Sequence, residues 1–239
     1  MQLDLTPSTK LFVLTGAGIS AESGIATFRD ANGLWENHRV EEVASPEGFA
    51  ASPATVWRFY AQRRAQAATV KPNPAHAALA GAERICGDNF FLATQNVDNL
   101  HEAAGSQRLI HMHGELFKTR CSDDDCTTLP FVDMRSSFAE LPRCSCGALQ
   151  RPHIVWFGEV PFEMLKIKRN VQACDIFVTV GSSGVVYPAA GLVREISFRK
   201  QNGESCISVY VGLERPDNAD EFDHVVLGKA GEVLPTLFR

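Results

Sequence analysis

Four cysteines lie close together in the chain, in two pairs. Cys121 and Cys126 are separated by four residues, Cys144 and Cys146 by one residue, and 17 residues lie between the pairs. In a chain expected to be cytosolic, clustered thiols indicate a metal rather than disulfides, and four thiolates in two close pairs suit tetrahedral zinc. Such a set leaves no open position for a reacting molecule, so the pattern predicts a structural zinc site. The alternative is a group of thiols that carries no metal.

A second candidate for chemistry is the segment Gly16-Ala17-Gly18-Ile19-Ser20, which directly follows the apolar run 11–15. Glycine lets backbone amides approach a diphosphate, and a helix N-terminus favours negative charge. The segment departs from the usual dinucleotide fingerprint, because the third glycine is missing and no strand-ending acid follows about 20 residues on. By itself it fits a phosphate-binding loop or a plain tight turn.

Two histidines and two further polar residues could act on a substrate. In a strand, His111 and His113 would point to the same side, and either could be a general base near neutral pH. The alternative is a structural histidine whose hydrogen bonds are satisfied within the chain. Asn96 and Asp98 also share a side. They could orient a sugar or an amide, or simply cap the helix expected over residues 99–104.

The elements that must position these residues follow from the hydrophobic pattern. Short apolar runs, as in strands buried on both faces of a parallel sheet, cover residues 11–15, 90–94, 175–180, 207–211 and 224–227. Stretches of helical character lie between them, over residues 53–70, 73–83, 162–174 and 189–201. Alternating strands and helices predict an α/β, doubly wound sheet, in which ligands bind at the C-terminal strand ends. Small and polar residues follow four of these strands, so we expect a composite site at that edge.

Composition limits the class of protein. The chain has 239 residues, of which 45% are apolar and 21% charged, close to globular averages. With 23 Lys and Arg against 28 Asp and Glu, the net charge of −5 argues against a nucleic-acid partner. No run approaches the ~20 apolar residues of a membrane span, and no signal-peptide pattern is seen. We therefore expect a cytoplasmic protein without a membrane partner.

Several motifs, in one order along the chain, resemble the signature of the sirtuins, which are NAD-dependent protein-lysine deacylases. The resemblance covers about residues 8–237, and its motifs lie at residues 16–25, 27–29, 95–98, 113–114, 155–159, 181–183 and 185–188 and at the four cysteines. It implies a Rossmann-like domain formed by residues 1–29, 76–116 and 153–239. A helical insert (30–75) and a zinc-binding insert (117–152) would together form a small domain.

The resemblance also implies which residues bind NAD, here a co-substrate. Gln95 and Asn96 would contact the nicotinamide ribose, and Asp98 the carboxamide. Phe28 and Arg29 would close over the cofactor near the nicotinamide. The full set at matching positions is Gly16, Ala17, Gly18, Ser20, Ala21, Phe28, Arg29, Trp35, Gln95, Asn96, Asp98, Gly181, Ser182, Ser183, Gly212, Leu213 and Ala230.

For the reaction, the resemblance implies that His113 is the general base, with Asn96 as its catalytic neighbour, and that His111 is structural. The acyl oxygen would displace nicotinamide, and His113 would take a proton from a ribose hydroxyl, giving lysine and O-acyl-ADP-ribose. The partners would be acyl-lysine proteins or peptides, bound as an added strand. Their expected contacts are Val155, Trp156, Phe157 and Gly158. The alternatives are an ADP-ribosyltransferase or NAD glycohydrolase on the same scaffold, and a non-catalytic acyl-lysine or NAD reader.

Acyl specificity is suggested by Tyr60 and Arg63, which lie three residues apart in a segment expected to be helical and therefore share a face. A hydroxyl and a guanidinium fork could together grip a carboxylate. This pattern is similar to that of class III sirtuins, so we expect removal of succinyl, malonyl and acetyl groups. The alternative is an ordinary helix whose arginines lie in water, since Arg64 follows directly.

Three positions depart from the family pattern. Ala26 replaces a usual proline, Gly184 stands where serine is common, and Gly212 replaces a usual asparagine. These departures put in doubt the stiffness of the cofactor loop and one side-chain contact to the adenosine ribose.

Overall fold

The computed structural model describes residues 1–25, 34–35 and 38–238. Its larger lobe is built on a six-stranded sheet in the order β11-β10-β9-β1-β4-β5, in which every neighbouring pair is parallel. The strands are β1 (Leu11–Thr15), β4 (Phe90–Thr94), β5 (Leu109–His111), β9 (Ile176–Val180), β10 (Ile207–Gly212) and β11 (His224–Leu227). This confirms the predicted parallel α/β sheet.

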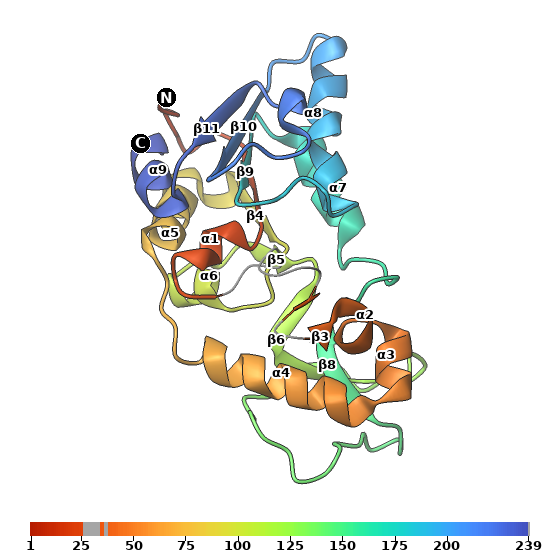
Figure 1. Ribbon diagram of the computed structural model, residues 1–239. Coiled ribbons are helices and arrows are strands. Elements are labelled where there is room, and N and C mark those ends of the chain that lie inside the picture. The colour runs from red at the N-terminus through yellow and green to blue at the C-terminus, as the bar shows by residue number, and fades with distance from the viewer. Residues whose placement is uncertain (26–33, 36–37, 239) are drawn as a thin grey trace.

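Helices cover both faces of this sheet, which is why its central strands β1 and β9 are mostly apolar and fully buried (Figure 1). In β1, Leu11 and Val13 face α5 (Pro74–Cys86) and α9 (Ala230–Leu237), whereas Phe12 and Leu14 face α7 (Met164–Ala173) and α8 (Leu192–Gln201). The short helices of this lobe are α1 (Gly18–Ala21), α6 (Leu100–Ala103), η1 (Gly87–Asn89), η2 (Ala189–Gly191) and η3 (Ala219–Glu221). Among the described residues, no helix is long and apolar enough to cross a membrane.

Helix α5 begins where the sequence predicts, and its cap also holds the segment after β1. The Asn73 Oδ1 atom accepts a hydrogen bond from the Ala75 amide at 2.9 Å, and Pro74 occupies the first turn, where its missing N–H has no intrahelical partner to lose. The Asn73 Nδ2 atom donates to the Ile19 carbonyl at 2.7 Å. The start of α5 therefore fixes the backbone of α1.

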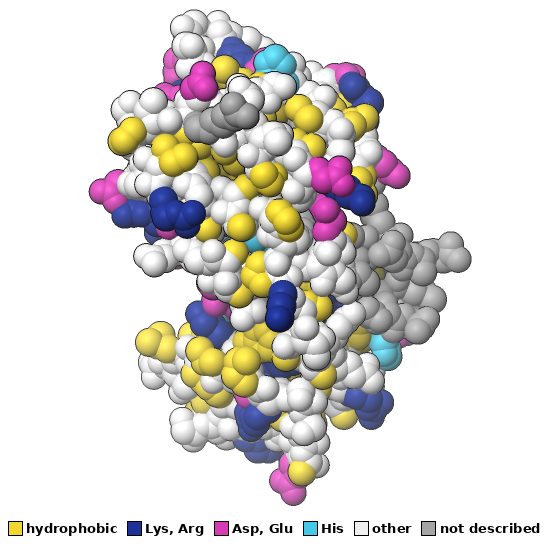
Figure 2. Space-filling model, turned by 90° about the vertical axis from the view of Figure 1, so that its left-hand side faces the viewer, with side chains coloured by type: hydrophobic (Ala, Val, Ile, Leu, Met, Phe, Trp, Pro, Cys, Tyr) yellow, Lys and Arg dark blue, Asp and Glu magenta, His cyan; other side chains and the backbone are white. Residues whose placement is uncertain are grey.

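The smaller lobe combines helices with an antiparallel sheet. Its helices are α2 (Val40–Val43), α3 (Pro46–Ala51) and α4 (Pro53–Ala67), and its sheet has the order β7-β6-β8, formed by β6 (Gly114–Cys121), β7 (Phe131–Val132) and β8 (Gln150–Ile154). A separate pair joins β2 (Leu34–Trp35) to β3 (His38–Arg39). Apolar side chains that include Phe59 and Leu116 pack α4 against the sheet. On one side of the molecule the outline narrows between the two lobes (Figure 2). We propose that residues 30–75 and 117–152 are the two inserts that form the small domain.

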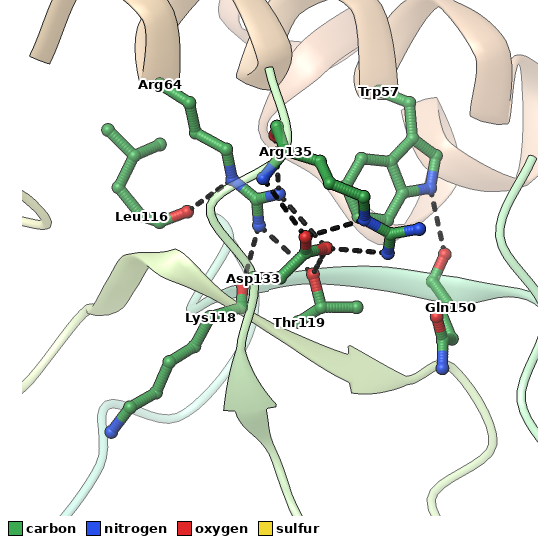
Figure 3. A network of polar contacts seen from close by, with 8 residues as sticks. All are labelled: Trp57, Arg64, Leu116, Lys118, Thr119, Asp133, Arg135 and Gln150. Atoms are coloured by element: carbon green, nitrogen blue, oxygen red, sulfur yellow. Dashed lines mark hydrogen bonds and ion pairs between the residues drawn. The ribbon is translucent and has the colours of Figure 1, made fainter. Parts of the chain in front are cut away.

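A buried ionic network fastens α4 to the small sheet (Figure 3). Arg64 is fully buried, and its Nη1 atom lies 3.2 Å from Asp133 Oδ2, while its Nε atom donates to the Leu116 carbonyl at 2.7 Å. Burial alone would raise the pKa of Asp133, but hydrogen bonds from Arg135 and Thr119, together with the Arg64 charge, hold this pKa well below its usual range. The carboxylate is therefore ionised, and the position of α4 is fixed by charged hydrogen bonds.

Candidate active site

A cavity of about 560 Å³ opens at the C-terminal ends of β1, β4, β9 and β10 and extends to α4 and the end of β8. The chain leaves β1 toward β4 and leaves β9 toward β10, so the cavity lies at a switch point of the strand order. Phe28, Arg29 and Ala26 lie outside the described residues, as does the side chain of Trp35. The other expected cofactor, catalytic and substrate residues all line the cavity: Gly16, Ala17, Gly18, Ser20, Ala21, Gln95, Asn96, Asp98, His113, Gly181, Ser182, Ser183, Gly212, Leu213, Ala230, Tyr60, Arg63, Val155, Trp156, Phe157 and Gly158.

The glycines after β1 are required by close contact with the loop after β9. A Cβ atom on Gly16 would lie 2.8 Å from the Gly181 carbonyl oxygen, and one on Gly18 would lie 2.7 Å from the Gly181 Cα. The amides of Gly16 and Gly18 donate at 2.9 Å to the carbonyls of Val180 and Gly181, so they are already paired within the chain. The packing of two loops therefore explains these glycines, and it leaves a floor of bare backbone at this end of the cavity.

Three polar side chains form a bonded group above this floor. The Asn96 Nδ2 atom donates to the Gly16 carbonyl and to Ser20 Oγ, both at 3.1 Å, and Ser20 Oγ donates to Asp98 at 3.0 Å. Asp98 also accepts the Leu100 amide at 3.1 Å, which is the capping role that the sequence left open. Burial raises the pKa of Asp98. Asn96 is thus held in one orientation by the segment after β1.

His113 has the tautomer of a base. Its Nδ1 atom lies 3.1 Å from the Gln95 carbonyl oxygen, which can only accept, so Nδ1 carries the proton and Nε2 carries a lone pair. Burial lowers the pKa of His113, and the bond to Gln95 opposes this only in part. The imidazole is therefore neutral near pH 7. The His113 carbonyl also accepts the Val155 amide at 2.9 Å, which connects it to the chain leaving β8.

His111 is bonded in a different way. Its Nδ1 atom lies 2.9 Å from the Asn96 carbonyl and its Nε2 atom lies 2.7 Å from Glu102, so both nitrogens face acceptors. Burial opposes its charge, but the hydrogen bond and charge of Glu102 raise the pKa of His111 overall. The expectation that His111 and His113 share one strand is wrong. β5 ends at His111, and His113 lies in the turn that precedes β6, which begins at Gly114 with a φ of 87°.

Close neighbours explain why Gly212 and Gly184, which depart from the family pattern, have no side chain. A Cβ atom on Gly212 would lie 2.3 Å from the Tyr210 hydroxyl, which donates to the Ser182 carbonyl at 3.1 Å. A Cβ atom on Gly184, where φ is 79°, would lie 2.3 Å from the Asn218 side chain. A larger residue at either position would displace a side chain that is already hydrogen-bonded.

At the other end of the cavity, α4 presents Tyr60 and Arg63, with exposed fractions of 0% and 8%. Arg64 is also buried, so the alternative in which these two arginines lie in water is wrong. The Tyr60 hydroxyl accepts a hydrogen bond from Trp156 Nε1 at 3.0 Å. The amides of Val155 and Phe157, expected to face a peptide, donate to carbonyls of this chain, so a bound strand would pair with other groups of this segment.

Two lining residues on α4, Gln66 and Ala67, were not predicted from the sequence. Gln66 follows Arg63 by three residues and lines the same cavity. The spacing that paired Tyr60 with Arg63 continues to Gln66, so the helical period was a sufficient signal.

The cysteines converge as predicted. The Cys121 and Cys146 sulfur atoms are 3.5 Å apart, those of Cys126 and Cys144 are 3.7 Å apart, and all four lie within 4.8 Å of one another. A tetrahedron with zinc–sulfur bonds of ~2.3 Å has sulfur–sulfur edges of about 3.8 Å. The cluster therefore fits one structural zinc ion, held at the end of β6 and ahead of β8.

Most of the chain matches one protein family. The family described as Sir2 matches residues 16–188. The chain belongs to the Sir2 family. It is 50% identical to an "NAD-dependent protein deacylase" of Pasteurella multocida (strain Pm70), over 97% of both chains. It is 47% identical to a protein of that name from Shewanella oneidensis, over 95% of this chain and 92% of the relative.

Solved Sir2 structures have the same fold. A Sir2 homologue in complex with NAD is 40% identical, with a TM-score of 0.83 over 96% of this chain and 88% of that one. A mutant homologue in complex with ADP ribose gives 0.85 at 40% identity, over 96% and 90% of the two chains. A Sir2 protein bound to acetylated peptide gives 0.77 at 28% identity, over 94% and 90%.

Proposed function

We propose that this protein is an NAD-dependent protein-lysine deacylase that releases lysine, nicotinamide and O-acyl-ADP-ribose. The observation that carries the proposal is the neutral His113. Its side chain is bonded to Gln95 on the cofactor side and its carbonyl to Val155 on the substrate side. The names of the relatives, and the NAD and acetylated-peptide complexes of Sir2 structures, support the same activity.

The cavity floor fits a dinucleotide, because the contacting glycines leave backbone where side chains would otherwise project. When bound, NAD supplies the ribose carbon that accepts the acyl oxygen. Asn96, fixed through Gly16 and Ser20, positions the nicotinamide ribose. His113 Nε2 accepts the proton of a ribose hydroxyl, and the Gln95 carbonyl stabilises the imidazolium that results.

We also propose that the enzyme removes succinyl and malonyl groups as well as acetyl groups. A carboxylate that enters the cavity loses its hydration, which is unfavourable unless charged hydrogen bonds replace it. Tyr60 and Arg63 are buried on one face of α4 and line the cavity. Arg64, by contrast, forms an ion pair with Asp133. A guanidinium fork and a hydroxyl donor provide the replacement bonds.

A cytoplasmic location and the absence of a specific nucleic-acid partner are proposed on composition. None of the seven cysteines, all of which are described, is in a disulfide, as is typical of cytosolic proteins, and the net charge is −5. On the face drawn in Figure 2, basic and acidic side chains are interspersed among apolar ones.

The test is a side-by-side assay of acetyl-, succinyl- and malonyl-lysine peptides with NAD, followed by mass spectrometry. We expect deacylated peptide and O-acyl-ADP-ribose in equal amounts. ADP-ribosylated protein without O-acyl-ADP-ribose would indicate a transferase. Nicotinamide release that does not depend on the acyl peptide would indicate an NAD glycohydrolase, and no release at all would indicate a reader.

A further inference from the structure

We propose that Trp156 is a positioning residue that sets the direction in which the Tyr60 hydroxyl donates, and thereby strengthens the preference for acyl groups with a carboxylate. This inference rests on the proposed deacylase function and on the proposed role of Tyr60 and Arg63. In this role Trp156 acts through Tyr60 and contacts neither the ribose nor the carboxylate.

The bond between the two side chains has only one possible polarity. Trp156 Nε1 lies 3.0 Å from the Tyr60 hydroxyl oxygen, and the two residues are 2% and 0% exposed. An indole N–H can only donate, so the Tyr60 oxygen is the acceptor and its own hydrogen points away from the indole. Burial raises the pKa of Tyr60, against the opposing effects of the Trp156 bond and the Arg63 charge. The hydroxyl therefore keeps its proton and remains a donor.

Trp156 is itself held on two sides. The Arg151 guanidinium carbon lies 3.4 Å from the centroid of the indole ring, and its two terminal nitrogens bind Glu159 at 2.6 and 2.9 Å. Glu159 also accepts the Trp156 amide at 2.7 Å. Burial alone would raise the pKa of Glu159, but the bonds from Arg151 and from this amide lower it. The carboxylate is thus ionised, and a partly buried, bidentate ion pair fixes both the backbone and the ring of Trp156.

The consequence concerns only acyl groups that end in an acceptor. When the indole N–H is present, it donates to the Tyr60 oxygen, so the hydroxyl proton must point elsewhere. We infer that it points toward a carboxylate bound beside Arg63. Without the N–H, the hydroxyl loses the bond from the indole, and a succinyl group meets a less ordered donor. An acetyl group has no carboxylate to bind. The ratio of desuccinylation to deacetylation therefore reports the orientation of the hydroxyl, while general packing effects act on both reactions and cancel.

The test uses Trp156→Phe, which keeps an aromatic ring and removes the donor. We expect the succinyl-to-acetyl ratio of kcat/KM to fall about 3- to 10-fold, the range for one neutral hydrogen bond, mostly through a higher KM for the succinyl peptide. In a Tyr60→Phe background the same substitution should leave the ratio unchanged. Phe49→Leu is the matched control. The ring centroids of Phe49 and Trp156 are 5.4 Å apart, so this substitution changes the packing on the indole and leaves its N–H intact. Its ratio should stay within about twofold of the wild-type value.

If Trp156→Phe does not fold, benzothienylalanine at position 156 replaces the N–H by sulfur in a ring of nearly the same shape. An unchanged ratio in either folded variant would overturn the proposal. So would an equal fall in the Tyr60→Phe background, because the effect would then not pass through the hydroxyl. Wild-type protein that removes acetyl but no succinyl would instead overturn the proposed acyl preference together with this inference. Loss of every NAD-dependent reaction in the wild type would overturn the proposed function itself.

Discussion

The two ends of the cavity hold their functional side chains by different means. At the end proposed to bind NAD, called the cofactor end below, Asn96 and His113 are positioned by bonds to backbone carbonyls of loops that leave parallel strands. At the end proposed to hold the acyl group, called the acyl end below, two ion pairs fix the elements that carry Tyr60 and Trp156. These are Arg64–Asp133, which is buried, and Arg151–Glu159, which is partly buried. Backbone positions depend on the whole sheet, whereas an ion pair depends on two side chains. The acyl end is therefore the end that single substitutions can alter without moving the groups of the chemical step.

The largest expected effect is zinc removal, which tests whether the acyl end depends on the small sheet. We expect one zinc per chain, and structural zinc sites contribute about 10–16 kcal/mol of apparent binding free energy to folding. Cys121 ends β6, and Cys144 and Cys146 precede β8, so chelation should lower the melting temperature and abolish deacylation. Elemental analysis and a thermal melt measure this. Active protein with reduced thiols and less than about half an equivalent of zinc would contradict the site.

The next largest effect should come from the cofactor end. His113→Ala removes the general base and should lower kcat/KM about 10²–10⁴-fold for every acyl group alike, while the protein stays folded. Steady-state assays with acetyl and succinyl peptides measure both losses. His111→Ala is the control, since His111 bonds Glu102 and does not line the cavity. An equal loss in folded His111→Ala would remove the distinction between the two histidines.

Sequence reasoning succeeded where the signal is local. The apolar runs became strands of the parallel sheet, although β11 lies at its edge with exposed ends and is not buried. The Asn73-Pro74 step became the start of α5, and the four closely spaced cysteines converge in one cluster. It failed at His113, because alternation has no means to detect a turn. The turn lies at Met112 and His113, and β6 begins directly after it at Gly114, where φ is positive and a Cβ would lie 2.1 Å from the His153 carbonyl oxygen.

The partners of buried charges were also beyond the sequence. Arg64 looked like a solvated residue because Asp133, its counter-ion, lies 69 positions away and follows β7. Likewise, the glycines after β1 suggested phosphate contact, whereas Gly181 accounts for their lack of side chains. Contacts between distant segments decide both cases, and no local pattern encodes them.

The adjacent residues Arg63 and Arg64 of α4 should differ in what their substitution changes, one the acyl preference and the other the stability of the fold. Arg63→Met should lower kcat/KM for desuccinylation at least about tenfold, because charged hydrogen bonds contribute roughly 1.5–3 kcal/mol each. Deacetylation should change only a few-fold, since acetyl-lysine carries no carboxylate. Arg64→Met should do the reverse: it leaves Asp133 buried with one cation fewer and should lower the free energy of unfolding by about 3 kcal/mol, with little effect on the acyl ratio. Equal losses of both activities in Arg63→Met would make Arg63 structural.

The smallest expected effect is a pH dependence that belongs to the cofactor end alone. His113 acts as a base only when neutral, so activity is present above its pKa and is lost as the pH falls through it. Burial lowers this pKa below the ordinary histidine value of about 6.5, despite the bond to Gln95. Lowering the pH from about 7.5 to about 6.5 should therefore cost less than twofold in kcat/KM, and a steeper loss should begin only below that. The hydrogen bond and charge of Glu102 raise the pKa of His111 against burial, so any titration of His111 would lie above the ordinary histidine value. Acetyl and succinyl peptides should give the same acid limb, because both reactions use one base. A limb centred above 6.5, a limb that differs between the two acyl groups, or one that moves in His111→Gln would show that the titrating group is not His113.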